Sequence, residues 1–311
     1  MQTSRDCIKN LGWEAELNRL IGAYAEGTLR AYRSDIKTFV RWCELNNQVP
    51  FPAPASDLSD FITHEAQRCS ASTLKRRLAA IGKIHRLMKH ESPVNDEEVK
   101  LALRRALRSK YSRPNQALGL TSNLRDQLIK ACDNSLSGKR DRALITVGYD
   151  TLSRRSELIL ICLEDLSFIE KGARVLIKRS KNDPFGKGRN SYLRYKTREY
   201  LQDWIKAAGI NEGPLFRAVK YGKIHSTSLH PYSVNRIIKK AALAAGLSKE
   251  EIQKLSGHSM RVGAAQDMMV AGLEILPIMA AGGWKTTNVV ARYIENADLS
   301  PLVSQFSKDN K

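Results

Sequence analysis

Residues 256–265 read Ser-Gly-His-Ser-Met-Arg-Val-Gly-Ala-Ala. Ser256 and Gly257 are residue types that favour a helix N-cap, and an apolar stripe at helical spacing follows them. The stretch therefore predicts a helix that begins beside His258. Residues three apart share a helix face, so His258 and Arg261 should point in the same direction. Such a pair is either structural or holds an anion.

The charge of the chain points to a polyanionic partner. Its 311 residues are enough for about two domains, and its net charge is +19. So large an excess favours nucleic acid, with an anionic membrane surface as the runner-up. No apolar run of about 18 residues exists to span a bilayer, so we expect no membrane partner. The N-terminus has no signal-peptide core, which predicts a cytoplasmic, nucleoid-associated protein.

Cofactor signatures are missing from the sequence. The five cysteines are scattered and show no C-x-x-C spacing, which argues against a zinc site and a disulfide framework. Neither a P-loop nor a dinucleotide-type glycine pattern is found. We therefore expect no cofactor.

The first third of the chain predicts four helices. They run from Gly27 to Asn47, from Ser56 onward, over 72–89 and near 96–109. Residues 1–70 have a net charge of −1, whereas residues 71–113 hold 12 basic and 4 acidic residues. A solvated helix face is the bland interpretation. A surface that neutralises DNA phosphates explains this local excess of positive charge better than a solvated helix face does.

The rest of the chain predicts a second, larger domain. Residues 1–113 form the first domain, a polar, proline-containing segment gives a linker at 114–120, and 121–311 form the second domain. Strand-like sequence at about 164–195 predicts a small antiparallel sheet with a loose hairpin tip, and helices resume from 196 nearly to the end. The predicted fold class is mainly α, with an all-α N-terminal domain and an α+β second domain.

Several polar or aromatic residues of the second domain could carry chemistry. Taken alone, each is ordinary, because a tyrosine or tryptophan in an apolar helix is usually core and hairpin lysines are usually solvated. In chain order they read Arg-x-x-Glu, Lys on a hairpin, His-x-x-Arg, Gly-Gly-Trp and Tyr. The residues are Arg154, Glu157, Lys181, His258, Arg261, Trp284 and Tyr293.

This ordered pattern resembles the signature of the tyrosine recombinases of the phage integrase family. The stretch GHSMRVGAAQDMMVAGLEILPIMAAGGWKTTNVVARYI, residues 257–294, is similar to a phage member of the family over its whole length. RWCELNNQVPFPA at 41–53 resembles its N-terminal domain, and NQALGLT at 115–121 resembles its linker. The resemblance covers about residues 20 to 295. It implies a DNA-clamping, core-binding N-terminal domain and a catalytic second domain.

The resemblance also implies roles for the signature residues. Tyr293 would be the nucleophile that forms a 3′-phosphotyrosyl link and frees a 5′ hydroxyl, without metal or ATP. Arg154 and Arg261 would hold the scissile phosphate, which suits guanidinium groups because each can make paired bonds to phosphate oxygens. His258 would be an acid/base partner, and Trp284 would donate its indole N–H. Glu157 would orient the site, and Lys181 would protonate the leaving oxygen.

Two of these assignments have alternatives. Arg155 stands where the family usually has an aliphatic residue, and Arg154 is chosen because Glu157 follows it three residues later. Arg155 would then contact DNA or form a surface ion pair. Lys181 fits the hairpin best, but Lys178 and Lys187 remain possible.

Target recognition is expected on helix 72–89 and on a helix that opens at His230, which line up with segments that enter the major groove in related enzymes. The candidate DNA-contacting residues are Lys75, Arg76, Arg77, Lys83, Arg86, Arg105, Arg155, Tyr232, Asn235 and Arg236. The base sequence that they would read does not follow from the residues.

The C-terminal tail predicts a short amphipathic helix at about 299–307. Leu299, Leu302, Val303 and Phe306 stand at helical spacing, and Pro301 suits a first turn. Such a helix is too short to stand alone, so it must dock, either on its own chain or elsewhere. By resemblance it enters a neighbouring protomer, which implies a monomer in solution and a homotetramer on two double-stranded DNA sites with inverted repeats.

The leading hypothesis is a site-specific DNA recombinase that acts through a Holliday junction. A type IB topoisomerase or a hairpin telomere resolvase would use a similar active site. From a different class, a DNA-binding protein without catalysis could keep the same fold.

Overall fold

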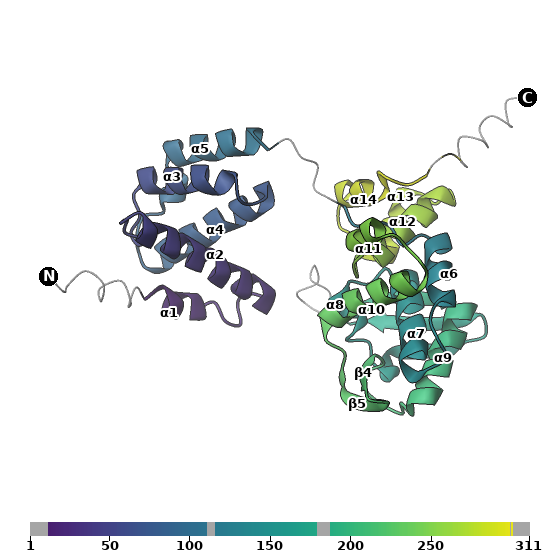
Figure 1. Ribbon diagram of the computed structural model, residues 1–311. Coiled ribbons are helices and arrows are strands. Elements are labelled where there is room, and N and C mark those ends of the chain that lie inside the picture. The colour runs from purple at the N-terminus through teal and green to yellow at the C-terminus, as the bar shows by residue number, and fades with distance from the viewer. Residues whose placement is uncertain (1–11, 111–115, 179–186, 299, 301–311) are drawn as a thin grey trace, which may run out of the picture. The chain divides into compact units, whose positions relative to one another are not determined.

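The computed structural model describes residues 12–110, 116–178, 187–298 and 300. The chain divides into two compact units, residues 1–114 and 115–311 (Figure 1). The predicted class, mainly α in two parts with a small antiparallel sheet, is confirmed. No helix among the described residues is long and apolar enough to cross a membrane.

The first unit is wholly helical over its described residues. Its elements are α1 (Trp13–Asn18), α2 (Glu26–Leu45), α3 (Ala55–Ala66), α4 (Ala71–Leu87), the short 3-10 turn Pro93–Asn95 and α5 (Glu97–Arg108). Aromatic side chains hold the core together, with the Phe39 and Phe61 rings 5.0 Å apart edge to face and Trp42 at 5.4 Å from Phe61. Such pairs add to the free energy gained by burial.

Two predicted helix starts in this unit were late by one or two residues. The N-cap of α4 is Ser70, whose hydroxyl accepts a hydrogen bond from the Thr73 N–H, so Ser72 lies inside the helix. The N-cap position of α3 is Pro54, not Ser56. Before α4 several N-cap-type residues lie close together, so sequence alone did not single out the one that begins the helix. Before α3 the cap position holds a proline, whose side chain accepts no hydrogen bond, so no cap signal marks it.

The second unit contains the sheets and the longest run of buried residues. Its elements are α6 (Ser122–Lys130), α7 (Leu136–Asp150), α8 (Arg155–Leu158), a 3-10 turn (Leu163–Asp165), β1 (Leu166–Ile169), β2 (Gly172–Ile177), β3 (Arg189–Arg194), α9 (Tyr195–Ala208), β4 (Arg217–Lys220), β5 (Lys223–Ser228), α10 (Pro231–Ala244), α11 (Lys249–Lys254), α12 (Ser259–Val270), α13 (Ile275–Gly282) and α14 (Thr287–Ile294).

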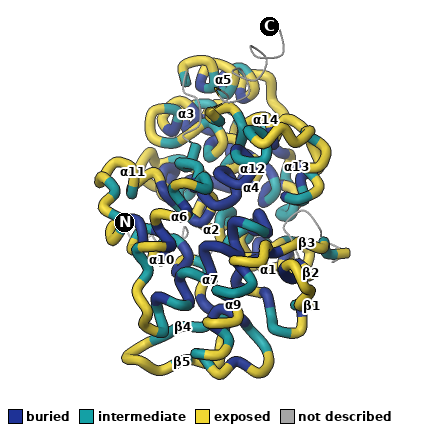
Figure 2. The backbone as a smooth tube through the Cα atoms, turned by 90° about the vertical axis from the view of Figure 1, so that its right-hand side faces the viewer, coloured by how far each residue is buried: buried dark blue, intermediate teal, exposed yellow. Residues whose placement is uncertain are grey.

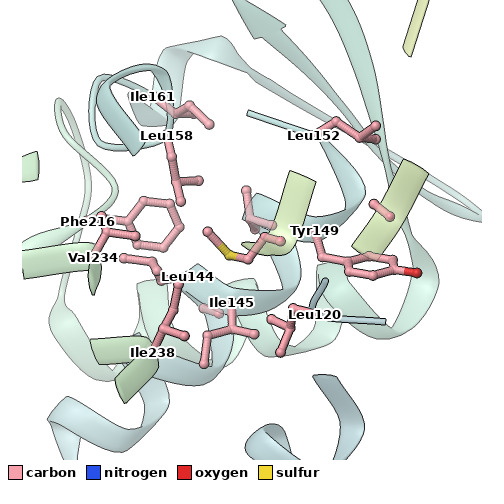
Figure 3. Close-up of a cluster of buried hydrophobic side chains, with 14 of the residues drawn as sticks. Leu120, Leu144, Ile145, Tyr149, Leu152, Leu158, Ile161, Phe216, Val234 and Ile238 are labelled. Atoms are coloured by element: carbon pink, nitrogen blue, oxygen red, sulfur yellow. The ribbon is translucent and has the colours of Figure 1, made fainter. Parts of the chain in front are cut away.

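Helix α7 is the centre of this unit. It is mostly dark blue in Figure 2, because every residue from Ala143 to Tyr149 is buried. Figure 3 shows Leu144 and Ile145 of α7 among Leu158, Phe216 and Val234, which come from three other parts of the unit. A helix buried on all sides is a rigid support, and the turn at its C-terminal end carries candidate site residues.

The main sheet has the order β1-β2-β3 and is antiparallel throughout. In β2, Ala173, Val175 and Ile177 are buried and alternate with exposed residues, as a half-buried strand requires. Ile177 pairs with Arg189 at the end of the sheet next to the hairpin tip. The sheet therefore presents the start of β3 to the candidate site.

One sheet was missed in the sequence. Strands β4 and β5 form an antiparallel hairpin within the stretch predicted to be helical. Their exposed positions are mostly polar, and β5 is largely yellow in Figure 2. The strands therefore lack the apolar alternation that predicts a strand.

The segment predicted as a linker belongs, from Gln116 onward, to the second unit. The Leu118 N–H donates to the Lys254 carbonyl at 3.0 Å, and the Leu120 N–H donates to the Ser259 carbonyl at 2.8 Å. Leu120 is fully buried. These contacts fix the segment on the second unit up to the start of α6.

Candidate active site

Four polar or aromatic signature residues meet at the start of α12 and the end of the chain's described part. His258 is the N-cap residue of α12, and Arg261 lies in its first turn. Trp284 follows α13, and Tyr293 lies in the last turn of α14. The centroid of the Tyr293 ring lies 5.0 Å from that of the His258 ring and 5.2 Å from that of the Trp284 ring.

The predicted start of α12 was slightly early. The helix begins at Ser259, because Ser256 and Gly257 lie in the preceding turn. The Ser256 hydroxyl accepts from the His258 N–H at 3.2 Å, and the Ser256 N–H donates to the Ser259 hydroxyl at 3.0 Å. This turn fixes the backbone of His258.

Arg261 is a buried cation whose hydrogen-bond donors are only partly satisfied among the described residues. Its side chain is fully buried. One nitrogen, Nη1, donates to the Leu152 carbonyl, whereas Nε and Nη2 have no hydrogen-bond partner among the described residues. Burial, and then the positive charge of Arg154, lowers the Arg261 pKa to about 10. Buried donors without partners are costly, so this arrangement calls for an anion.

Trp284 presents a second donor beside this guanidinium. Its ring lies 4.1 Å from Cζ of Arg261, and its indole N–H is buried without a partner in the described structure. The double glycine before it has a steric reason. A Cβ on Gly282 would lie 2.1 Å from the Trp284 ring, and Gly283 adopts a left-handed φ of +62°.

Arg154 and Glu157 form a pair at the N-terminus of α8. The Arg154 Nη1 donates to Glu157 Oε1 at 2.6 Å, and the Arg154 N–H donates to Glu157 Oε2 at 3.0 Å. Glu157 is buried, whereas the Arg154 side chain keeps 21% of its surface. The Glu157 carboxylate therefore fixes the orientation of the Arg154 guanidinium, which still has access to solvent.

His258 is neutral at neutral pH. Desolvation lowers its pKa to about 4, and the positive charges of Arg261 and Arg154 add to this effect. The residue as a whole remains exposed in the free protein, so an incoming molecule can reach it. A neutral imidazole can accept a proton.

Arg189 is a site residue that the sequence reasoning missed. From the start of β3 it donates to the Ala281 carbonyl at 2.8 Å and to the Thr151 carbonyl at 2.7 Å, and its Nη2 lies 3.8 Å from Glu157 Oε2. Burial lowers its pKa. Its partners lie far away in the chain and are mostly backbone carbonyls, so no local pattern signals the role.

Of the three hairpin lysines, Lys178 and Lys187 belong to the described residues. Lys181 lies outside the described residues, as do Leu299, Leu302, Val303 and Phe306 of the tail. Lys178 forms an ion pair with Asp165 at 2.5 Å, which raises the lysine pKa. Lys187 is exposed. Lys178 is therefore already engaged with a carboxylate.

The DNA-contacting candidates of the second unit surround the turn before α12. The Arg155 guanidinium lies 4.6 Å from the exposed Tyr232 ring, and Arg236 donates to the Ser233 hydroxyl at 3.0 Å. The Asn235 Oδ1 accepts from the Gly257 N–H at 2.7 Å. Asn235 therefore stabilises the loop that carries His258.

In the first unit, two candidate arginines have internal partners. The Arg76 side chain makes paired bonds to Asp35 at 2.7 and 3.0 Å, and Arg77 pairs with both Asp35 and Glu65. Both carboxylates are buried. Arg77, with 16% of its side chain exposed, neutralises them, so little of its guanidinium is left to contact DNA. Arg76 keeps 44%.

The other first-unit candidates lie closer to solvent. Lys75, Arg86 and Arg105 are exposed, and Arg86 reaches the Ser92 hydroxyl at 3.4 Å. Lys83 is half-buried and sits 5.4 Å from the Tyr24 ring centroid. These four side chains remain available to a polyanion.

A basic face on α2 was also missed. Together with Ser34 and Thr38, four exposed cations line one shallow groove: Arg30, Arg33, Lys37 and Arg41. Their i, i+3 and i+4 spacing could have revealed this face. The charge sum over residues 1–70 concealed it, because acidic residues elsewhere cancel the excess.

Comparisons with known proteins agree with this geometry. The sequence model of the phage integrase family matches residues 119–299, and that of the phage integrase N-terminal SAM-like domain matches residues 17–92. An integrase/recombinase XerD homologue of Selenomonas ruminantium is 31% identical over 90% of this chain and 85% of its own length. The Cre recombinase of Escherichia phage P1 is 29% identical over 95% and 91%.

Solved structures share the fold. XerH site-specific recombinase bound to palindromic difH substrate superimposes with a TM-score of 0.66 at 16% identity, covering 91% of this chain and 80% of that one. A lambda integrase fragment bound to a COC′ core site gives 0.63 at 15% identity, covering 93% and 95%. Since one family model spans more than half of the chain and the relatives match nearly end to end, this chain belongs to the phage integrase family, the tyrosine recombinases.

Proposed function

We propose that this chain is a site-specific DNA recombinase whose nucleophile is Tyr293. The phenol oxygen attacks the scissile phosphorus, the bond from phosphorus to the 5′ oxygen breaks, and a 3′-phosphotyrosyl link and a free 5′ hydroxyl result. A 5′ hydroxyl from the partner duplex then attacks the link, which restores the phosphodiester through a Holliday junction. Each step exchanges one phosphodiester for another, so the proposal needs neither ATP nor metal.

The observation that carries this proposal is the set of buried donors beside the Tyr293 ring. Two nitrogens of Arg261, Nε and Nη2, and the indole nitrogen of Trp284 have no hydrogen-bond partner among the described residues. A phosphate gathers extra negative charge as it becomes pentacoordinate, and prearranged donors in a desolvated site stabilise that charge strongly. A purely structural arginine at this depth would have its donors satisfied.

The neighbouring residues supply the remaining functions. Arg154 forms the second guanidinium of the cradle, oriented by Glu157. Neutral His258, next to the Tyr293 ring, takes part in removing the phenol proton. Lys181 protonates the leaving 5′ oxygen.

The proposed partner is double-stranded DNA with an inverted-repeat site, bound by a homotetramer of protomers that are monomeric when free. The net charge of +19 and the cations of α2 and α4 would neutralise backbone phosphates. Exposed Tyr232 and Arg236, at the start of α10, are the candidates for reading bases. The tail around Leu302 would link the protomers.

The test is a denaturing pull-down of the protein from its own host, with the attached DNA sequenced. Wild type is compared with Tyr293→Phe and with Tyr195→Phe, a variant at an exposed tyrosine of α9. We expect adducts at one inverted-repeat sequence for wild type and Tyr195→Phe, and none for Tyr293→Phe. Native pull-downs of all three should recover DNA.

Other outcomes select the alternatives. Adducts scattered over the genome would favour a type IB topoisomerase. Adducts at DNA hairpin ends would favour a telomere resolvase. If a nicked trapping substrate also fails to give an adduct while native pull-downs succeed, the protein binds DNA without catalysis.

A further inference from the structure

The backbone of the candidate nucleophile is held by two glutamine side chains. Gln116 Nε2 donates to the Arg292 carbonyl at 2.8 Å and to the Tyr293 carbonyl at 3.2 Å. Gln266 Nε2 donates to the same Tyr293 carbonyl at 3.3 Å. The last carbonyls of a helix have no partner within the helix, so these amides cap the C-terminus of α14 at Tyr293 itself.

The orientation of the Gln116 amide follows from its surroundings. A carbonyl can only accept, so the atom that faces Arg292 and Tyr293 must be the nitrogen. The other end, Oε1, accepts from Asn296 Nδ2 at 2.5 Å. All three contacts agree with one amide orientation and would be lost or inverted in the other.

Both glutamines belong to backbone segments that are held firmly in place. Gln266 lies on α12, the helix that also carries Arg261, and it is buried. Gln116 begins the segment fixed by the backbone bonds of Leu118 and Leu120 described above. The approach is close, because a Cβ on Gly263 of α12 would lie 2.0 Å from the Leu120 carbonyl.

We propose that Gln116 and Gln266 are positioning residues that set the Tyr293 phenol against the phosphate held by Arg261. This inference rests on the proposed role of Tyr293 as nucleophile. The tyrosine lies on α14 and the proposed phosphate-binding arginine lies on α12. The Gln266 amide ties these two helices directly through the Tyr293 carbonyl, and the Gln116 amide ties α14 to the segment that packs against α12. A displacement of about 1 Å at a reacting atom costs up to about 100-fold in rate.

Because a helix C-terminus favours hydrogen-bond donors and positive charge, three substitutions of Gln116 should have clearly different effects. Gln116→Glu keeps the shape but removes the donors and adds negative charge beside helix carbonyls, where negative charge is unfavourable. Gln116→Lys keeps a donor of similar reach and adds positive charge, which is favourable there. Gln116→Ala simply removes the contact. Gln116 is half-buried and at the surface, so none of these changes leaves a core cavity.

The experiment measures single-turnover formation of the protein–DNA adduct at saturating DNA. The substrate is a nicked duplex that carries the sequence recovered in the pull-down. We expect cleavage to fall at least about tenfold in Gln116→Ala, further in Gln116→Glu, and to stay near wild type in Gln116→Lys. Gln266→Glu should behave like Gln116→Glu. DNA affinity of the Gln116 variants should stay unchanged, and their melting temperatures should move by no more than about 4 °C.

Gln127→Ala, at an exposed glutamine of α6, is the matched control and should cleave like wild type. If Gln116→Glu cleaves as fast as wild type while Tyr293→Phe gives no adduct, the positioning role is wrong and the nucleophile assignment stands. If the rate loss is accompanied by an equal loss of DNA affinity, the glutamines serve binding and the inference also fails. An adduct that persists in Tyr293→Phe removes the proposed function itself.

Discussion

The guanidinium carbon of Arg261 lies 4.1 Å from the centroid of the Trp284 ring, and both side chains are buried. The ring covers one face of the cation, while Nε and Nη2 of the arginine and the indole nitrogen have no hydrogen-bond partner among the described residues. An anion that enters this site would therefore find donors already in place.

We predict opposite effects of Arg261 on stability and on activity. Arg261→Lys keeps the charge but cannot make paired bonds to phosphate, so cleavage should fall about 100- to 1000-fold. Arg261→Met removes the charge, which should leave the melting temperature at or above that of wild type and abolish cleavage. Differential scanning calorimetry and a nicked-duplex cleavage assay measure the two effects. Normal cleavage by either variant would contradict the phosphate-binding role.

His258 should make the free protein less stable in mild acid. Its folded pKa of about 4 lies below the ordinary value of 6.5. Between these values the unfolded chain binds a proton that the folded chain does not, so stability falls as the pH drops through 6.5 and this contribution levels off near pH 4. His258→Gln removes that proton.

Urea unfolding at pH 7.5 and pH 5 tests this dependence. Wild type should lose more stability than His258→Gln on moving to pH 5. An equal loss in the two proteins would mean that His258 has an ordinary pKa. His225→Gln, at an exposed histidine of β5, serves as the control and should follow wild type.

Arg77 and Lys75 should separate folding from DNA binding. Arg77→Ala leaves the buried carboxylates of Asp35 and Glu65 short of a partner, which should lower the free energy of unfolding of the first unit by about 3–5 kcal/mol. Lys75→Ala should change it by less than about 0.5 kcal/mol. Chemical denaturation measures both. A strongly destabilised Lys75→Ala, or an unaffected Arg77→Ala, would reverse the assignment.

The basic face of α2 should contribute to DNA affinity without reading sequence. Each of Arg33→Gln and Lys37→Gln should reduce the slope of log affinity against log salt by about 0.9, on specific and non-specific duplexes alike. Fluorescence anisotropy at several salt concentrations gives the slope. Lys100→Gln, whose lysine pairs with Glu97 at 3.2 Å, is the control. An effect confined to the specific duplex would indicate base contacts instead.

The sequence predicted the residues of the candidate site better than the residues that hold them in place. Arg154, His258, Arg261, Trp284 and Tyr293 could be proposed from their order in the chain, because the family pattern is specific. In the structure the side chains of the last four lie next to one another. The positive charge of Arg154 is close enough to lower the pKa of both His258 and Arg261. Helices with an apolar stripe were also predicted, with starts that were off by one or two residues.

The missed features depend on contacts between distant parts of the chain. The sequence around Arg77 is typical of a surface cation. Its partner Asp35 lies 42 residues earlier in the chain, and only the structure shows the contact. Arg189 finds its partners in carbonyls of other elements. The β4–β5 hairpin lacks an apolar alternation because most of its side chains face solvent. No local pattern carries this information.

The packing of residues 116–120 bears on the construction of chimeric recombinases. An engineer who exchanges DNA-recognition modules between relatives would naturally cut in the stretch between the two units. A crossover placed after Leu120 would import a foreign residue at Gln116 and a foreign partner for Gly263. On the positioning role proposed for Gln116, such a graft would cleave poorly even where it binds DNA. The junction belongs before Gln116, so that the catalytic module travels with its own anchor.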